Sequence, residues 1–285
     1  PLSATSFPQV VRNDFDGEGE SDLLVYHAAA GTWYALRTNS IPPNQIVQWG
    51  WSSATPVLAD FDGDAAVDHS VYFPPNGNWY IRRSSSGSLQ QLGWGWIDAR
   101  PVPGDYDGDG QDDVAVYHPA AGNWYVRRSS TGTLQLQSWG WSTATPVPGD
   151  YDGDGTTDFA VYHQAAGNWY VRRSSNGSLF QLNWGWSGAQ AVPADYDGDG
   201  LTDLAVYYPA GGTWFIRRSS DGSLLQQNWG WSDALPAAAD YDHDGKADIT
   251  VYHPATGTWY IRLSSTGGLR QRGWGWSAAL PVLSP

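Results

Sequence analysis

The chain has 285 residues and a formal net charge of −14, with 18 Trp but no Cys and no Met. The lack of Cys excludes disulfides and thiolate metal sites, and the negative charge, with Arg dispersed along the chain, argues against a nucleic acid partner. No apolar run approaches the roughly 18 residues of a membrane-spanning helix, so we expect no membrane span, and the absence of an initiator Met indicates a processed or excised soluble segment.

Three motifs recur along the chain about every 45 residues. An aspartate-rich segment begins at Asp14, Asp60, Asp105, Asp150, Asp195 and Asp240. A second motif, such as NWYVRRSS, contains an aromatic pair whose Trp is Trp33, Trp79, Trp124, Trp169, Trp214 or Trp259. The triplet WGW begins at Trp49, Trp94, Trp139, Trp184, Trp229 and Trp274. The pattern predicts a single domain over residues 1–285, with six repeats that start near residues 10, 56, 101, 146, 191 and 236.

Within the unit at residues 101–141, four short strands are predicted in chain order: PVPGDY, DVAVYHP, NWYVRRSS and LQLQSWGW. Gly, Pro or Asn clusters bound each of them, and no stretch has the length and period of a helix. Repeated four-stranded units of this length are typical of propeller blades. The predicted fold class is therefore an all-β, six-bladed β-propeller with four-stranded antiparallel blades, and a linear solenoid is the alternative.

Both ends of the chain resemble the first strand of a blade. The segments SATSFPQVVRN (3–13) and SAALPVLSP (277–285) both resemble TATPVPGD (143–150), and a closed ring needs only one of them. The N-terminal segment runs directly into the Asp14 loop, so we expect it to supply the first inner strand. Residues 277–285 are then a tail or linker. If residues 3–13 do not supply the first inner strand, residues 277–285 are the closing segment. Blade 1 also differs in its fourth strand, where TNSIPPNQIVQ (38–48) carries one extra residue.

The aspartate-rich loops follow the first strand of each repeat and have the chemistry of a metal site. In DYDGDGQDD, carboxylates occupy loop positions 1, 3, 5 and 9, and position 7 offers a backbone carbonyl. Oxygen ligands in this alternation suit a hard divalent cation, and calcium tolerates irregular coordination better than magnesium. A calcium loop between the first and second strands of each blade is therefore predicted, with up to six calcium ions, and a solvated acidic loop is the alternative.

The predicted ligands are four carboxylates in each loop. They are Asp14, Asp16, Glu18 and Asp22; Asp60, Asp62, Asp64 and Asp68; Asp105, Asp107, Asp109 and Asp113; Asp150, Asp152, Asp154 and Asp158; Asp195, Asp197, Asp199 and Asp203; and Asp240, Asp242, Asp244 and Asp248. Loops 1 and 2 are expected to be the weakest sites. Loop 1 has the longer Glu18 at position 5, and loop 2 has Ala65 where Gly is expected, which costs about 1 kcal/mol if its φ is positive. In loop 6, His243 replaces the Gly at position 4.

The repeat PVPGDYDGDGTTDFAVYHQAAGNWYVRRSS resembles the FG-GAP/VCBS repeat family of secreted and surface proteins, which includes the propeller of integrin α chains. The Asp-rich loop and the following DxAVY strand carry the resemblance, over residues 10–276. It implies blades with calcium loops on one face, in an extracellular or cell-surface protein that acts in adhesion, carbohydrate binding or as a scaffold. Members more often have seven blades.

A repeated aromatic and polar set favours a multivalent, lectin-like binder of carbohydrate. In the third repeat this set is His118, Trp124, Tyr125, Arg128, Trp139 and Trp141, and each repeat carries equivalents. Trp faces stack on sugar rings, Arg and His donate to hydroxyls, and six weak sites give avidity. The alternatives are that Trp only fills the space between blades, and that the protein is a structural or protein-interaction module with an extracellular protein as partner.

Other repeated residues are interpreted as structural. The position held by His27, His118, His163 and His253 is Phe73 and Tyr208 elsewhere, which indicates packing rather than proton transfer. The Arg pairs of the third strands are expected to solvate edges or pair with acids, with acidic glycans as the alternative.

No asymmetric constellation of acid, base or nucleophile is recognisable, so we expect no enzyme, and a polysaccharide-acting enzyme is the alternative. The residues left over are Glu20, His69, Asp98, Asp112, Asp221 and Asp233, and they belong to different repeats.

Overall fold

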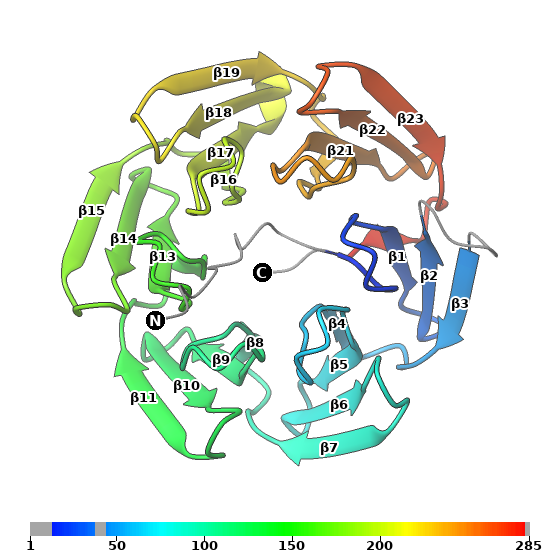
Figure 1. The fold of residues 1–285 in the computed structure, drawn as a ribbon, viewed down its shortest axis with the longest axis vertical. Coiled ribbons are helices and arrows are strands. Elements are labelled where there is room, and N and C mark those ends of the chain that lie inside the picture. The colour runs from blue at the N-terminus through cyan, green and yellow to red at the C-terminus, as the bar shows by residue number, and fades with distance from the viewer. Residues whose placement is uncertain (1–12, 38–43, 283–285) are drawn as a thin grey trace, which may run out of the picture.

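A computed structural model describes residues 13–37 and 44–282, which form a ring of six blades (Figure 1). Each blade is a four-stranded antiparallel sheet, and its strands follow one another from the centre of the ring outward. The described residues contain one short 3-10 helix, η1 (Pro209–Gly211), and no helix among them has the length and hydropathy needed to cross a membrane. The prediction of an all-β, six-bladed propeller is confirmed.

The first three blades have the following strands, in order from the inner to the outer edge. Blade 1 contains β24 (Leu280–Pro281), β1 (Leu23–His27), β2 (Thr32–Leu36) and β3 (Asn44–Gln48). Blade 2 contains β4 (Thr55–Val57), β5 (His69–Phe73), β6 (Asn78–Arg82) and β7 (Leu89–Gly93). Blade 3 contains β8 (Arg100–Pro101), β9 (Val114–His118), β10 (Asn123–Arg127) and β11 (Leu134–Ser138).

The other three blades repeat this order. Blade 4 contains β12 (Thr145–Pro146), β13 (Phe159–His163), β14 (Asn168–Arg172) and β15 (Leu179–Asn183). Blade 5 contains β16 (Gln190–Ala191), β17 (Leu204–Tyr208), β18 (Thr213–Arg217) and β19 (Leu224–Asn228). Blade 6 contains β20 (Leu235–Pro236), β21 (Ile249–His253), β22 (Thr258–Arg262) and β23 (Leu269–Gly273).

Burial decreases from the second strand of a blade to the fourth. In β9 the first four residues are all buried, because neighbouring blades cover both faces of this strand. In β10 buried and half-buried residues alternate, and in β11 exposed and half-buried residues alternate. The runs of Val, Ala and Tyr in the second strands therefore form the core of the ring.

The hydrophobic core lies between blades, and one fully buried Trp is at the centre of each contact. Trp124 packs with Tyr106 of its own blade and with Phe159 of blade 4, and its side chain has no exposed surface. Its indole N–H donates a 2.7 Å hydrogen bond to the carbonyl oxygen of Trp139. The buried polar atom is thus satisfied, which makes this large side chain a stable core residue.

The central Gly of each WGW triplet is required by a close approach. Gly140 has a φ of 128°, and a Cβ at this position would lie 2.5 Å from the hydroxyl oxygen of Tyr117. That hydroxyl donates to the carbonyl oxygen of Trp141 at 2.8 Å. The triplet therefore turns tightly over the end of β9 as the chain passes to the next blade.

The C-terminal segment closes the ring, so the expectation that residues 3–13 supply the first inner strand is wrong. β24 pairs with β1, with Leu280 opposite Tyr26 and Pro281 opposite Val25. The reason is the regular spacing of the repeat: β24 follows the sixth WGW triplet as each other inner strand follows the triplet before it. Residues 3–12 lie outside the described residues.

Candidate functional site

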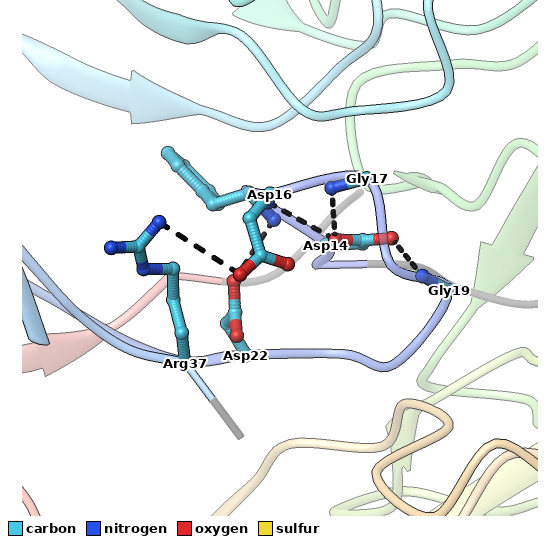
Figure 2. Close-up of polar contacts among 7 residues, drawn as sticks. Asp14, Asp16, Gly17, Gly19, Asp22 and Arg37 are labelled. Atoms are coloured by element: carbon cyan, nitrogen blue, oxygen red, sulfur yellow. Dashed lines mark hydrogen bonds and ion pairs between the residues drawn. The ribbon is translucent and has the colours of Figure 1, made fainter. Parts of the chain in front are cut away.

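In blades 2 to 6 an aspartate-rich loop joins the inner strand to the second strand, and in blade 1 the loop directly precedes the second strand, β1. We number the six loops 1 to 6 in chain order. The loop has the same local structure in each blade. In loop 3, the carboxylate of Asp105 at position 1 accepts hydrogen bonds from the backbone N–H groups of Gly108 (2.6 Å) and Gly110 (2.8 Å). Figure 2 shows the equivalent contacts in loop 1, where Asp14 accepts from Gly17 and Gly19. The first Asp therefore folds the loop around its own side chain.

The Asp at position 9 holds the far end of the loop. In loop 3 one carboxylate oxygen of Asp113 accepts from the N–H of Tyr106 at 3.0 Å, and the other accepts from the N–H of Ser129 at 2.6 Å. Asp113 is fully buried. These bonds tie both ends of the loop to the turn that follows β10.

Two Ser residues that the sequence interpretation did not include line the same loop. The hydroxyl of Ser129 lies 3.0 Å from both carboxylate oxygens of Asp109 at position 5, and the hydroxyl of Ser130 donates to Oδ2 of Asp107 at position 3. Both Ser belong to the repeated RSS that ends the motif NWYVRRSS. The two Ser follow the loop at a constant separation in sequence, and this spacing could have identified them as part of the site.

The carboxylates converge in the loops. One oxygen from each of positions 1, 3 and 9 lies within 4.8 Å of the others in loops 1 to 4, and positions 1, 3 and 5 do so in loop 5. Asp109 of loop 3 is outside the group that converges this closely, and its carboxylate accepts from the hydroxyl of Ser129. Most of the predicted ligand set is thus brought together.

One oxygen in each of five loops is buried and accepts no hydrogen bond from the described residues. It is Oδ1 of the Asp at position 3, and the residues are Asp62, Asp107, Asp152, Asp197 and Asp242. An unpaired buried carboxylate oxygen is costly unless a cation binds it.

The electrostatics of the loops favour a cation for the same reason. Burial, reinforced by neighbouring carboxylates, raises the pKa of the position-9 carboxyl to about 8 in Asp22, about 7 in Asp248 and about 6 in Asp113. Burial also raises the pKa of the position-1 carboxyl of Asp105, although three backbone N–H groups act against the shift. A bound divalent cation would reverse these shifts, since it stabilises the ionised form.

The residues present fit calcium. All the side-chain donors in the cluster are oxygens, which are the ligands of hard cations, and no described residue in it offers nitrogen or sulfur. Calcium binds oxygens at about 2.3–2.6 Å, so two ligands on opposite sides of the ion are up to about 5 Å apart. The oxygens of each group lie within 4.8 Å of one another, so they are close enough to bind one ion.

Loops 1, 2 and 6 each have a local feature of their own, and the expected weakness of loops 1 and 2 as sites stays a prediction. In loop 1 the guanidinium of Arg37 lies 3.8 Å from Oδ2 of Asp16, where other loops place a Ser hydroxyl (Figure 2). In loop 2 Ala65 has a φ of 70°, a conformation that disfavours a side chain. His243 of loop 6 has a φ of 59°.

The predicted sugar-binding residues of one blade do not form one cluster. Trp124 is a core residue, and Arg128 lies at the end of the blade that carries the aspartate loop, where its Nε donates to Gln135 at 3.0 Å. His118 and Trp141 lie at the opposite end of the strands. Trp139 is half-buried, and its indole N–H donates to Tyr170 of blade 4.

The structure instead builds aromatic trios across blade boundaries. The third residue of each WGW triplet packs edge to face or tilted against two rings of the next blade, as Trp96 does against His118 and Tyr125, with centroids 5.0 Å away in both cases. The trios are Trp51, Phe73 and Tyr80; Trp96, His118 and Tyr125; Trp141, His163 and Tyr170; Trp186, Tyr208 and Phe215; Trp231, His253 and Tyr260; and Trp276, His27 and Tyr34.

The Trp of a trio reaches the surface. Trp51 and Trp186 expose 36% and 38% of their surface, in contrast to Trp124. An amide lies beside two of the trios: Asn168 Nδ2 donates to the hydroxyl of Tyr170 at 3.4 Å, and Asn78 makes the same contact with Tyr80 at 3.5 Å.

Comparison with known families and structures agrees with this architecture. A family model described as FG-GAP-like repeat matches residues 105–161, 150–206 and 195–251, which together span just over half of the chain. No curated protein matches the chain in sequence.

Several solved structures share the fold at low sequence identity. A lectin of Agrocybe aegerita, described as recognising non-reducing terminal N-acetylglucosamine, superposes with a TM-score of 0.60 at 16% identity, over 97% of this chain and 84% of the lectin. A streptogramin B lyase superposes with a TM-score of 0.58 at 9% identity, over 96% of this chain and 86% of the lyase. A chain of the mitotic checkpoint complex superposes with a TM-score of 0.53 at 13% identity, over 95% of this chain and 83% of that chain. At these identities the likeness concerns the fold alone.

Proposed function

The chain belongs to the FG-GAP-like repeat family, and we propose that it is a calcium-stabilised propeller that binds carbohydrate at the aromatic trios between its blades. The carboxylates at positions 1, 3, 5 and 9 of each loop would hold calcium, together with the carbonyl at position 7. The ion would neutralise a group of carboxylates of which those at positions 1, 3 and 9 are buried or half-buried. The observation that supports this part most strongly is the same unpaired, buried Oδ1 in five loops.

The proposed calcium binding also favours one cellular location for the protein over another. Extracellular calcium-binding modules commonly have dissociation constants of about 10⁻⁴ to 10⁻³ M, so such sites fill outside cells and stay largely empty in cytosol. We therefore propose an extracellular or cell-surface protein.

Calcium binding is tested by melting the protein with and without a chelator. A ligand that binds only the folded state stabilises it by mass action, so chelation should lower the melting temperature. The variant with Asp107→Asn and Asp109→Asn should lose one bound ion in equilibrium dialysis. An unchanged melting curve in excess EDTA would count against structural calcium.

The carbohydrate proposal rests on the trios. A part-exposed indole can stack on the apolar face of a sugar ring, while the neighbouring imidazole, phenol or amide groups can bond its hydroxyls. Six trios around one ring would add avidity to weak individual sites. The fold is shared with a lectin and with a chain of a protein assembly, so the trios carry this choice.

We also propose that the protein is not an enzyme. Two of the leftover acidic residues already have partners: Asp112 accepts from the N–H of Asp60 at 2.8 Å, and Asp233 lies 3.7 Å from His253. His69 is buried against Phe15 and Trp33. These contacts support structural roles in separate places.

A glycan array with calcium tests the carbohydrate proposal. The wild-type protein should bind a specific set of sugars, and the double variant Trp96→Ala with Trp141→Ala should lose about tenfold or more in apparent affinity, because it removes two of the trios. Leu134→Ala, on the exposed outer strand, is the matched control and should bind like wild type. If no sugar binds and a stable protein is recovered from the native environment instead, the protein is an interaction module.

A further inference from the structure

Six backbone hydrogen bonds join the aspartate loops into a closed ring. In each one, the N–H of loop position 8 donates to the carbonyl oxygen of the position-1 Asp in the preceding loop, at 2.7 Å. The donor and acceptor pairs are Val67 and Asp14, Asp112 and Asp60, Thr157 and Asp105, Thr202 and Asp150, Ala247 and Asp195, and Ser21 and Asp240. The last pair links loop 1 to loop 6, so the circuit is complete.

Each of these bonds connects the ligands of two neighbouring sites. The accepting carbonyl of Asp105 belongs to a ligand residue of loop 3, and the donor, Thr157, immediately precedes Asp158, a ligand residue of loop 4. Thr157 is itself buried. Asp158 itself accepts from the N–H groups of Tyr151 and Ser174, at 2.9 and 2.6 Å. The bond from Thr157 therefore links Asp105 to the backbone beside a ligand residue of the next site.

The loops also pack side by side. A Cβ on Gly153, at position 4 of loop 4, would lie 3.4 Å from Leu201 at position 7 of loop 5. At the seam between loops 6 and 1, His243 takes the place of that Gly and its Nδ1 lies 2.6 Å from the carbonyl oxygen of Gly19. Neighbouring loops therefore share backbone and side-chain contacts all around the ring.

A loop in this arrangement has two states of different order. Without a cation, three carboxylate oxygens within 4.8 Å of one another repel, which loosens the loop. With a cation, the same oxygens are held in place, and so is the carbonyl that receives the bond from the next loop. Ordering one loop then lowers the cost of ordering its neighbour.

We propose that the six calcium sites are coupled through this ring and fill cooperatively, each loaded loop raising the affinity of the loops beside it. The inference rests on the proposed calcium binding and adds its regulation. Its consequence is a propeller that changes from loose to rigid over a narrow range of calcium concentration.

Two variants with the same number of disabled loops test the coupling. Both disable two loops by Asp→Asn at positions 3 and 5, which removes charge while keeping side-chain shape. The adjacent variant changes loops 3 and 4 through Asp107, Asp109, Asp152 and Asp154, and the separated variant changes loops 3 and 5 through Asp107, Asp109, Asp197 and Asp199. In the separated variant loop 4 keeps no intact neighbour, whereas every intact loop of the adjacent variant keeps at least one.

Calorimetric calcium titrations then distinguish the outcomes. Coupling predicts that the site of loop 4 in the separated variant is weaker by about fivefold or more than the same site in the wild-type protein. Identical isotherms for the two variants, with calcium still bound, would overturn the coupling and leave the calcium proposal intact. No binding by the wild-type protein would overturn both.

Two further measurements do not depend on those variants. The wild-type titration should have a Hill coefficient above one, and a coefficient of one or less would contradict coupling. Amide exchange is measured with calcium present in the variant that disables loop 3 alone, Asp107→Asn with Asp109→Asn. Exchange at Thr157, whose N–H donates to Asp105, should be about fivefold faster than in wild type. Exchange at Thr202, whose N–H donates to Asp150, should change less. Unchanged exchange at Thr157 would contradict it as well.

Discussion

The indole N–H of Trp139 in blade 3 donates a 3.2 Å hydrogen bond to the backbone carbonyl oxygen of Tyr170 in blade 4. The first Trp of each of the other five WGW triplets makes the same bond to the blade that follows it, and the sixth bonds to Tyr34 of blade 1. The triplet therefore joins blades twice, through this N–H and through the aromatic trio.

Trp139→Phe should lower the free energy of unfolding by about 1 kcal/mol more than Trp141→Phe does. Both substitutions make the same change in size, but of these two indole N–H groups only that of Trp139 has a hydrogen-bond acceptor among the described residues. Urea unfolding measures the difference. Equal losses for the two variants would mean that the inter-blade bond contributes nothing.

Loop position 6 is Ala65 in loop 2 and Gly110 in loop 3, and exchanging these two residue types gives a matched pair of variants. Ala65→Gly should relieve the strain of a φ of 70° and raise stability, whereas Gly110→Ala, at a φ of 87°, should lower it by about 1 kcal/mol. A Cβ on Gly110 meets nothing within 4 Å, so its cost is that of the backbone alone. Thermal melting checks both signs, and a stabilised Gly110→Ala would be the contradictory result.

The calcium-free protein should become more stable as the pH falls from about 8 to about 5. The folded-state pKa of Asp22 is raised from 3.8 to about 8 and that of Asp248 to about 7, so in this range the folded state binds more protons than the unfolded state. The stability that these two carboxyl groups contribute is present at low pH and is lost as the pH rises through their folded-state pKa values.

With calcium bound, the sign should reverse, because protons compete with the ion for the same oxygens. Calorimetry on calcium-stripped and calcium-loaded protein across this pH range separates the two cases. Parallel pH profiles would show that these carboxylates hold no cation.

Removal of residues 277–285 should destabilise the ring. It takes away β24, the buried Ala279 and Val282, and the backbone bond from Val282 to Leu24, so we expect a loss of at least about 2 kcal/mol. Adding the peptide SAALPVLSP in trans should restore part of the melting temperature. A truncated chain that melts like the full chain would show that β24 does not close the ring.

The sequence was informative wherever the repeat itself carries the signal. The spacing of the Asp and Trp motifs predicted six blades and placed the loops, because each blade must bury the same faces against its neighbours. The residues of DYDGDGQDD predicted that the carboxylates at positions 1, 3, 5 and 9 converge; positions 1, 3 and 9 lie close together in loops 1 to 4, and positions 1, 3 and 5 do so in loop 5. The resemblance to FG-GAP repeats agreed with both.

Contacts between repeats could not be predicted in the same way. Trp141 and His118 belong to one repeat, but each packs across a different blade boundary, and Arg128 lies at the other end of the strand. Which terminus closes the ring also depends on packing, because both end segments resemble an inner strand. Periodicity identifies equivalent residues, whereas only the three-dimensional arrangement shows which of them meet.

The most direct test of calcium binding is a crystal structure determined in millimolar calcium. We predict density for an ion in the aspartate loops, with oxygens of Asp105, Asp107 and Asp113 at about 2.4 Å from the ion in loop 3. Loops that splay into solvent and hold no cation under these conditions would contradict calcium binding.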